Sequence, residues 1–159
     1  MGQKEMEAVK KFLDENKIEY ELLVHEPVYT SEQAARVRGG ELKRGVKALV
    51  LKTREKKFIL GLVAADRKID LNALASIVGT KELKLASPEE VLEKTGCKIG
   101  SVHPFGNLYK LETYMDESVL ENDKVEFNIG LHTHSIRMKM KDLVKLINPI
   151  IKNFSVKNR

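Results

Sequence analysis

The sequence contains a single cysteine and no tryptophan, and it lacks long apolar runs. With Cys97 alone among 159 residues, no disulfide can form within the chain and no cysteine-based zinc cluster can assemble. No apolar run approaches the roughly 20 residues that a membrane-spanning helix needs. The polar N-terminus shows no signal-peptide pattern. We therefore expect a cytoplasmic protein with no membrane partner.

The signatures of several large enzyme classes are also missing. No Gly-x-Gly-x-x-Gly or phosphate-loop motif follows an apolar run, which argues against a standard nucleotide-binding site. No Gly-x-Ser-x-Gly segment is present, so a serine nucleophile on a strand-to-helix turn is not predicted. Cys97 follows Gly96 at the expected end of a helix, where the helix dipole raises the pKa of a thiol. A catalytic cysteine is therefore not expected.

The composition is that of an ordinary globular domain, with 42% hydrophobic residues and a net charge of +5. The length predicts one domain over residues 1–150, followed by a C-terminal tail at 151–159. The charge permits a nucleic acid partner without requiring one. Basic residues are in local excess between positions 36 and 54. They form either a solvated face or a set of phosphate contacts.

Local signals predict a domain that mixes single helices with hairpins. Thr30 and Gln33 form a capping box that begins a helix ending near Val37. Ser87-Pro88 begins another helix, which ends at Gly96. Apolar periodicity predicts further helices at 4–16, 71–78 and 141–147, a turn or short helix at 116–121, and strands at 18–24, 45–53, 57–64, 83–86, 107–113, 124–131 and 134–140. Because strands and helices do not alternate strictly, we expect an α+β domain with a mixed sheet.

Lys47 interrupts an otherwise apolar strand. In a strand, alternate residues share a face, so Lys47 lies on the same side as Leu49 and Leu51. Burying an ammonium group without a partner is costly. Lys47 therefore either lies at the fraying start of the strand and extends to water, or it points into a pocket and holds an anionic or carbonyl oxygen.

A glycine-bracketed loop is the second candidate site. Its two glycines permit backbone conformations and close approaches that other residues do not, and its proline stiffens it. Backbone N–H groups in such a loop can bind a carbonyl oxygen or an oxyanion. A tight connection between a helix and a strand is the alternative interpretation. The loop consists of Gly100, Ser101, Val102, His103, Pro104, Phe105 and Gly106.

Four histidines are present, at positions 25, 103, 132 and 134. His132 and His134 would point the same way on a strand and could ligate a metal ion. No third ligand and no His-Glu-x-x-His motif accompanies them. We therefore predict no metal site.

Five segments, in this order, resemble the YbaK/ProX-type family of aminoacyl-tRNA deacylases, which also occurs as the editing domain inserted in bacterial prolyl-tRNA synthetases. They are His25–Thr30, Val46–Lys52, Ala65–Leu71, Gly100–Gly106 and Gly130–His132. The resemblance spans nearly the whole chain. The fold that it implies is a mixed, mainly antiparallel, barrel-like sheet flanked by helices, which agrees with the elements predicted above.

The resemblance implies roles for particular residues. Lys47 matches the family's strand lysine and is expected to be catalytic, holding the terminal phosphate or polarising the ester carbonyl. The loop from Gly100 to Gly106 matches the substrate-binding loop, although His103 stands where the family often has threonine or another small residue. Three further positions match the pocket walls: Thr30, Gly130 and His132. Phosphate contacts are expected from Arg36, Arg38, Lys43, Arg44 and Arg67.

The reaction implied is hydrolysis of the ester that joins a wrong amino acid to the tRNA 3′ end. It uses no cofactor, no metal and no enzyme nucleophile; the substrate's ribose hydroxyl positions a water, or the substrate's own thiol attacks. The expected substrate of this freestanding trans-editing enzyme is Ala- or Cys-tRNA(Pro), and the expected partners are tRNA and a prolyl-tRNA synthetase. Two alternatives are a catalytically silent tRNA- or synthetase-binding module of the same fold and a hydrolase of small acyl esters. Retention of Lys47 disfavours the former, and the lack of a nucleophile disfavours the latter.

Overall fold

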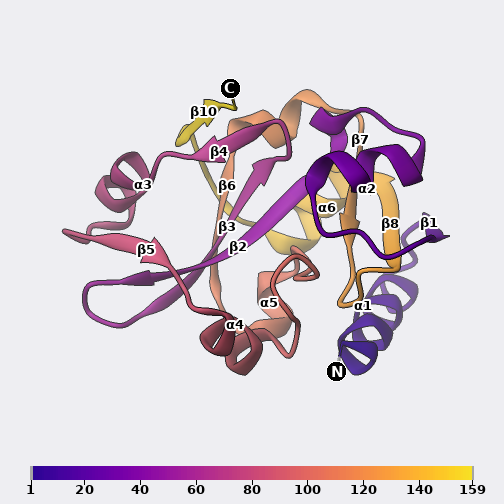
Figure 1. The fold of residues 1–159 in the computed structure, drawn as a ribbon, viewed down its shortest axis with the longest axis horizontal. Coiled ribbons are helices and arrows are strands. Elements are labelled where there is room, and N and C mark those ends of the chain that lie inside the picture. The colour runs from indigo at the N-terminus through magenta and orange to yellow at the C-terminus, as the bar shows by residue number, and fades with distance from the viewer. Residues whose placement is uncertain (1, 159) are drawn as a thin grey trace.

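Three β-sheets form the framework of the fold, which a computed structural model describes for residues 2–158 (Figure 1). The strands are β1 (Tyr20–Val24), β2 (Val46–Thr53), β3 (Phe58–Ala64), β4 (Arg67–Ile69), β5 (Leu83–Leu85), β6 (Glu112–Asp116), β7 (Lys124–Asn128), β8 (His134–Lys139), β9 (Ile150–Lys152) and β10 (Ser155–Lys157). The largest sheet has the order β5–β2–β3–β6–β9, the second β1–β8–β7, and β10 pairs with β4. The β3–β6 and β6–β9 pairs are parallel and the other pairs of named strands are antiparallel. The α+β class with a mixed, mainly antiparallel sheet is confirmed.

Helices flank these sheets, and their ends follow the capping residues. They are α1 (Gln3–Glu15), α2 (Ser31–Arg38), α3 (Leu71–Val78), α4 (Pro88–Thr95), α5 (Gly106–Tyr109) and α6 (Met140–Ile147), with 3-10 turns η1 (Leu42–Arg44) and η2 (Glu117–Glu121). The Thr30 hydroxyl accepts the N–H of Gln33 at 3.1 Å, and the Ser87 hydroxyl accepts that of Glu90 at 3.2 Å. The predicted capping box at Thr30 and the predicted helix start at Ser87 are therefore confirmed.

Two hydrophobic clusters lie on the two faces of β2. Val46 and Val50 belong to the main core, which also contains side chains of α1, β7, β8 and α6. Leu51 points the other way, into a smaller cluster with Leu74 and Phe154. The predicted alternation along this strand is thus confirmed. Gly45 forms a bridge to Glu126, so the start of β2 joins β7 of the second sheet.

Three expectations about the fold are wrong. The strand predicted at 107–113 is instead the short helix α5 followed by β6, because the Gly106–Tyr109 turn packs its aromatic residue against the loop before it. The expected tail contains β9 and β10 and is held by Phe154, which is 1% exposed and donates its N–H to Asp116 Oδ1 at 2.7 Å. The sheet strands described in residues 2–158 do not close into a barrel.

No helix within residues 2–158 is long and apolar enough to cross a membrane.

Candidate active site

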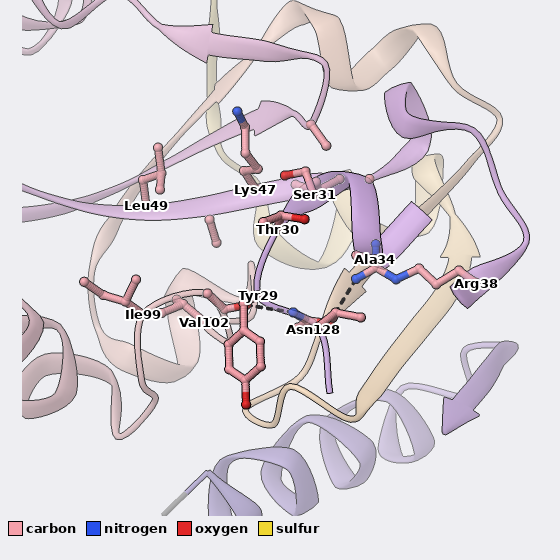
Figure 2. A pocket seen from close by; sticks show the side chains of 16 residues that line it. Tyr29, Thr30, Ser31, Ala34, Arg38, Lys47, Leu49, Ile99, Val102 and Asn128 are labelled. Atoms are coloured by element: carbon pink, nitrogen blue, oxygen red, sulfur yellow. Dashed lines mark hydrogen bonds between the residues drawn. The ribbon is translucent and has the colours of Figure 1, made fainter. Parts of the chain in front are cut away.

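A cavity of about 220 Å³ opens where α2, the start of β2, the loop after α4 and the end of β7 meet (Figure 2). Each segment supplies one side of it. The lining residues are Val28–Ser31, Ala34 and Arg38 from the α2 side, Gly45–Leu49 from β2, Ala65 after β3, Ile99, Gly100 and Val102 from the loop, and Asn128 from β7. Five residues that the sequence singled out therefore meet here: Thr30, Arg38, Lys47, Gly100 and Val102.

The cavity lies along an open edge of the largest sheet. β5 pairs with β2 only over Leu51–Thr53, whereas β3 pairs with β2 from Val46 to Lys52. Among the strands described in residues 2–158, none pairs with the segment from Lys47 to Leu49 on the cavity side. Because backbone groups alternate in direction along a strand, the N–H and C=O of Ala48 face this open edge. A ligand in the cavity can hydrogen-bond to them.

The Lys47 side chain is half-buried at this edge. Burial lowers the pKa of its amine below the ordinary lysine value, and the nearby carboxylates of Glu32 and Asp66 oppose that shift. Neither carboxylate forms a hydrogen bond with the amine. Lys47 thus presents a partly desolvated cation at the cavity, which is an arrangement suited to a polar or anionic ligand.

Gly100 and Val102 of the glycine-bracketed loop line the cavity, whereas Ser101 is buried behind them and does not. Gly100 has a φ of 88°, a conformation that side chains rarely adopt. Its carbonyl accepts a hydrogen bond from Asn128 Nδ2 at 2.7 Å. The Ser101 hydroxyl donates to the Lys98 carbonyl at 2.7 Å, and the Ser101 carbonyl accepts the N–H of Gly130 at 2.8 Å. Gly130 therefore supports the loop from behind and does not line the cavity.

The remainder of that loop lies in the protein core. His103 is 1% exposed, its ring stacks on Tyr109 with centroids 4.2 Å apart, and burial lowers its pKa to about 3. Phe105 packs edge-on against Phe12 and Phe127. A side chain at Gly106 would collide with Thr113, and Pro104 is buried. These four loop residues were expected to contact substrate, but the structure does not bring them to the cavity.

Sequence reasoning missed the polar network that fixes the other side of the cavity. Arg38 donates to Asn128 Oδ1 and to the Ser135 hydroxyl, at 3.0 Å in each case. The Ser135 hydroxyl also lies 3.0 Å from Asn128 Oδ1 and 2.8 Å from His25 Nε2. Burial lowers the pKa of Arg38 to about 10. Through Asn128, this network holds the Gly100 carbonyl.

Thr30 and His132 lie at the rim. The Thr30 hydroxyl is used by the helix cap, so the residue shapes the wall next to Ser31. His132 is half-buried, and its Nε2 lies 3.0 Å from the Ile99 carbonyl. Its ring is tilted against that of Tyr29, with centroids 4.8 Å apart.

A metal centre is not assembled by the residues described. Among positions 2–158, no three His, Cys, Asp or Glu side chains gather in a way that could hold an ion. His132 precedes β8 while His134 begins it, so the two do not share a strand as the sequence suggested. Cys97 is buried, and burial raises the pKa of its thiol. No histidine or cysteine is among the described residues that line the cavity, so neither metal ligation nor a thiol nucleophile is proposed there.

Comparison with known proteins gives consistent matches across most of the chain. Residues 25–146 match the family described as the aminoacyl-tRNA editing domain. The chain is 35% identical over 146 residues to the multifunctional Ser/Thr-tRNA deacylase ProXp-y of Escherichia coli (strain K12), covering 89% of this chain and 87% of that protein. It is 29% identical to the prolyl-tRNA editing protein ProX of Acetoanaerobium sticklandii, covering 89% of each.

A solved structure agrees with these matches. The crystal structure of a proposed trans-editing enzyme for prolyl tRNA synthetase superposes with a TM-score of 0.82 at 28% identity, covering 98% of both chains. The resemblance found in the sequence is confirmed. The chain belongs to the aminoacyl-tRNA editing domain family.

Proposed function

We propose that this protein is a freestanding trans-editing deacylase that hydrolyses the ester of a mischarged tRNA in the Lys47 cavity. Its family and its relatives named as deacylases support a hydrolase acting on the aminoacyl-tRNA ester bond. One observation carries the assignment to this cavity: the Lys47 cation and the Gly100 backbone both line the same small space. This pairing suits a reaction in which negative charge develops on an ester oxygen.

In the proposed mechanism, a water attacks the ester carbonyl carbon and the carbonyl oxygen becomes an oxyanion. The Lys47 ammonium group stabilises that charge or holds the terminal phosphate, and it does not act as a nucleophile. The backbone N–H groups of Gly100 and Val102 are the candidate neutral donors. The tetrahedral intermediate then collapses, and the ribose oxygen leaves and takes up a proton. The products are the free amino acid and a tRNA with an intact 3′ hydroxyl.

The walls of the cavity favour a small amino acid side chain. Ala34, Val46 and Ala48 are among the residues that line it, and they are small or short. Alanine and cysteine are therefore the first candidates, on tRNA(Pro). Serine and threonine join them because the E. coli relative is named a Ser/Thr-tRNA deacylase. The hydroxyl of Ser31, which also lines the cavity, offers a hydrogen bond to such a side chain.

A panel of mischarged tRNAs tests this proposal. Alanyl, cysteinyl, seryl and threonyl esters on tRNA(Pro), and on their own tRNAs, are incubated with the protein and the release of amino acid is followed. We expect rapid release of at least one small amino acid. Binding of the tRNA without any release would favour the catalytically silent module instead.

We expect tRNA binding to depend modestly on salt. Of the five basic residues expected to contact phosphate, Arg38, Arg44 and Arg67 are engaged by polar groups of the protein, whereas Arg36 is exposed and Lys43 forms only an exposed ion pair with Glu41 at 3.8 Å. With Lys47, about three phosphate contacts would give a slope of about −2 for log affinity against log salt.

The measurement is affinity against salt for a whole tRNA and for an acceptor-stem mimic. Similar slopes would show that the protein binds mainly the 3′ end, which leaves room for a prolyl-tRNA synthetase partner to supply tRNA selectivity. A much steeper slope for the whole tRNA would contradict this, because the body of the tRNA would then be bound as well.

A further inference from the structure

The cavity is too small for the whole end of the substrate. Its volume of about 220 Å³ is below the 300–1,000 Å³ range that pockets for small ligands usually have. An aminoacyl ester joined to a complete nucleoside therefore exceeds it. If the ester lies beside Lys47, the nucleobase lies outside, on the rim.

The rim carries two large exposed hydrophobic side chains. Among the residues that line the cavity, Tyr29 is 71% exposed and Ile99 is 52% exposed. Tyr29 is the one aromatic residue among the exposed large hydrophobic residues of positions 2–158. Figure 2 shows the Tyr29 ring directed away from Lys47, with Thr30 between them. A ligand that reaches both must extend across the mouth of the cavity.

Tyr29 is held in place although its ring is exposed. The preceding residue, Val28, is 1% exposed and donates its N–H to the His132 carbonyl at 3.0 Å. The N–H of Tyr29 itself donates to Gln33 Oε1 at 2.9 Å. One side of the ring is supported by His132, whose Nε2 lies 3.0 Å from the Ile99 carbonyl. The rest of the ring is open to solvent, so it forms a preorganised flat surface.

We propose that Tyr29, supported by His132, is the surface on which the base of the substrate's terminal nucleotide stacks. This inference rests on the proposed function and adds a base subsite to it. Stacking on an aromatic side chain accepts any base, because every base has a π-face. Ile99 borders the base on the opposite side of the mouth. The subsite places the ribose, and with it the ester, over the cavity that contains Lys47.

Binding of a hydrolysis-resistant probe tests the stacking directly. The probe is an RNA acceptor-stem hairpin whose terminal ribose carries alanine through a 3′ amide, made with the terminal base and without it. The proteins are the wild type, Tyr29→Ala, Tyr29→Phe and the control Leu85→Ala, whose side chain is 58% exposed on β5, far from α2 in Figure 1. Dissociation constants are measured for every combination.

We expect removal of the base to weaken binding to the wild type about 5-fold or more. In Tyr29→Ala the same removal should change the dissociation constant by no more than about 2-fold, because the stacking partner is already gone. Tyr29→Phe and Leu85→Ala should behave as the wild type. If removal of the base weakens binding to Tyr29→Ala as much as it weakens binding to the wild type, the proposal is overturned, since the base would then be bound elsewhere.

The binding experiment tests the stacking separately from the proposed hydrolysis. If the wild type binds the probe but releases no amino acid from any tRNA, the proposed hydrolysis fails and the comparison of dissociation constants still decides the stacking. If the wild type does not bind the probe, the stacking proposal is overturned, and the panel of mischarged tRNAs decides the proposed hydrolysis independently. Circular dichroism of Tyr29→Ala establishes that the variant is folded.

Discussion

Replacing Lys47 with alanine should lower the rate of deacylation at least about 100-fold while leaving the protein folded. Two cations line the cavity, and Arg38 is already bound to Asn128 and Ser135, so the Lys47 amine is the one that remains for the substrate. Since it forms no hydrogen bond with Glu32 or Asp66, its removal leaves no buried partner uncompensated. The single-turnover rate on the best substrate, together with a thermal unfolding curve, checks both parts.

Lys52→Ala is the matched control for this substitution. Lys52 lies on the same strand but on the opposite face, and it donates to Glu90 at 2.6 Å, away from the cavity. The control should keep the wild-type rate. A wild-type rate in Lys47→Ala, or an equal loss in both variants, would contradict the assigned role.

The same lysine predicts a particular pH dependence. Burial lowers its pKa, so the ammonium form should be lost at a lower pH than for an exposed lysine. If the cation is required, the enzymatic rate, corrected for spontaneous ester hydrolysis, should fall as pH rises through that lowered pKa.

Replacing Arg137 with methionine should lower the free energy of unfolding by about 3–5 kcal/mol. Glu126 is fully buried, with 0% exposure, and its Oε2 accepts a hydrogen bond from Arg137 Nε at 2.7 Å. Arg44 lies farther away, at 3.8 Å, and the other carboxylate oxygen has no partner among the described residues. Loss of Arg137 therefore leaves a buried carboxylate with little compensation. Urea unfolding measures the change.

An exposed ion pair provides the comparison. Lys57 and Glu112 lie 3.2 Å apart with side chains 58% and 41% exposed, so Lys57→Met should cost no more than about 1 kcal/mol. Adding Glu126→Gln to Arg137→Met should recover part of the loss, because the uncompensated charge is removed. If Arg137→Met and Lys57→Met lower the free energy of unfolding equally, burial of Glu126 does not determine how much its ion pair with Arg137 stabilises the fold.

The elements predicted correctly are those fixed by neighbouring residues. The capping box of Thr30 and Gln33 sets the start of α2 within three positions of sequence, and the apolar alternation around Lys47 sets the faces of β2. Lys47 was noticed because burying an ammonium group without a partner is costly, but its catalytic role was predicted only through the family resemblance. Such signals are local and can be read from the sequence.

The features that were missed depend on residues far apart in the chain. Arg38 and Asn128 are 90 positions apart, and nothing near Asn128 in the sequence indicates that it holds Gly100. In the glycine-bracketed loop, a local signal was present but was interpreted wrongly. Gly106 was interpreted as allowing a ligand to approach, but its lack of a side chain makes room for Thr113. Glycine in a sequence signals a close approach without identifying what approaches.

The central claim is that this protein removes a wrong amino acid from tRNA and spares the right one. The most direct measurement compares release of labelled amino acid from a mischarged tRNA(Pro), carrying the best substrate of the panel, with release from Pro-tRNA(Pro), using the wild type in excess. We predict that the mischarged ester is hydrolysed far above its spontaneous rate while the prolyl ester stays at that rate. Spontaneous rates for both esters, or equal acceleration of both, would contradict the account.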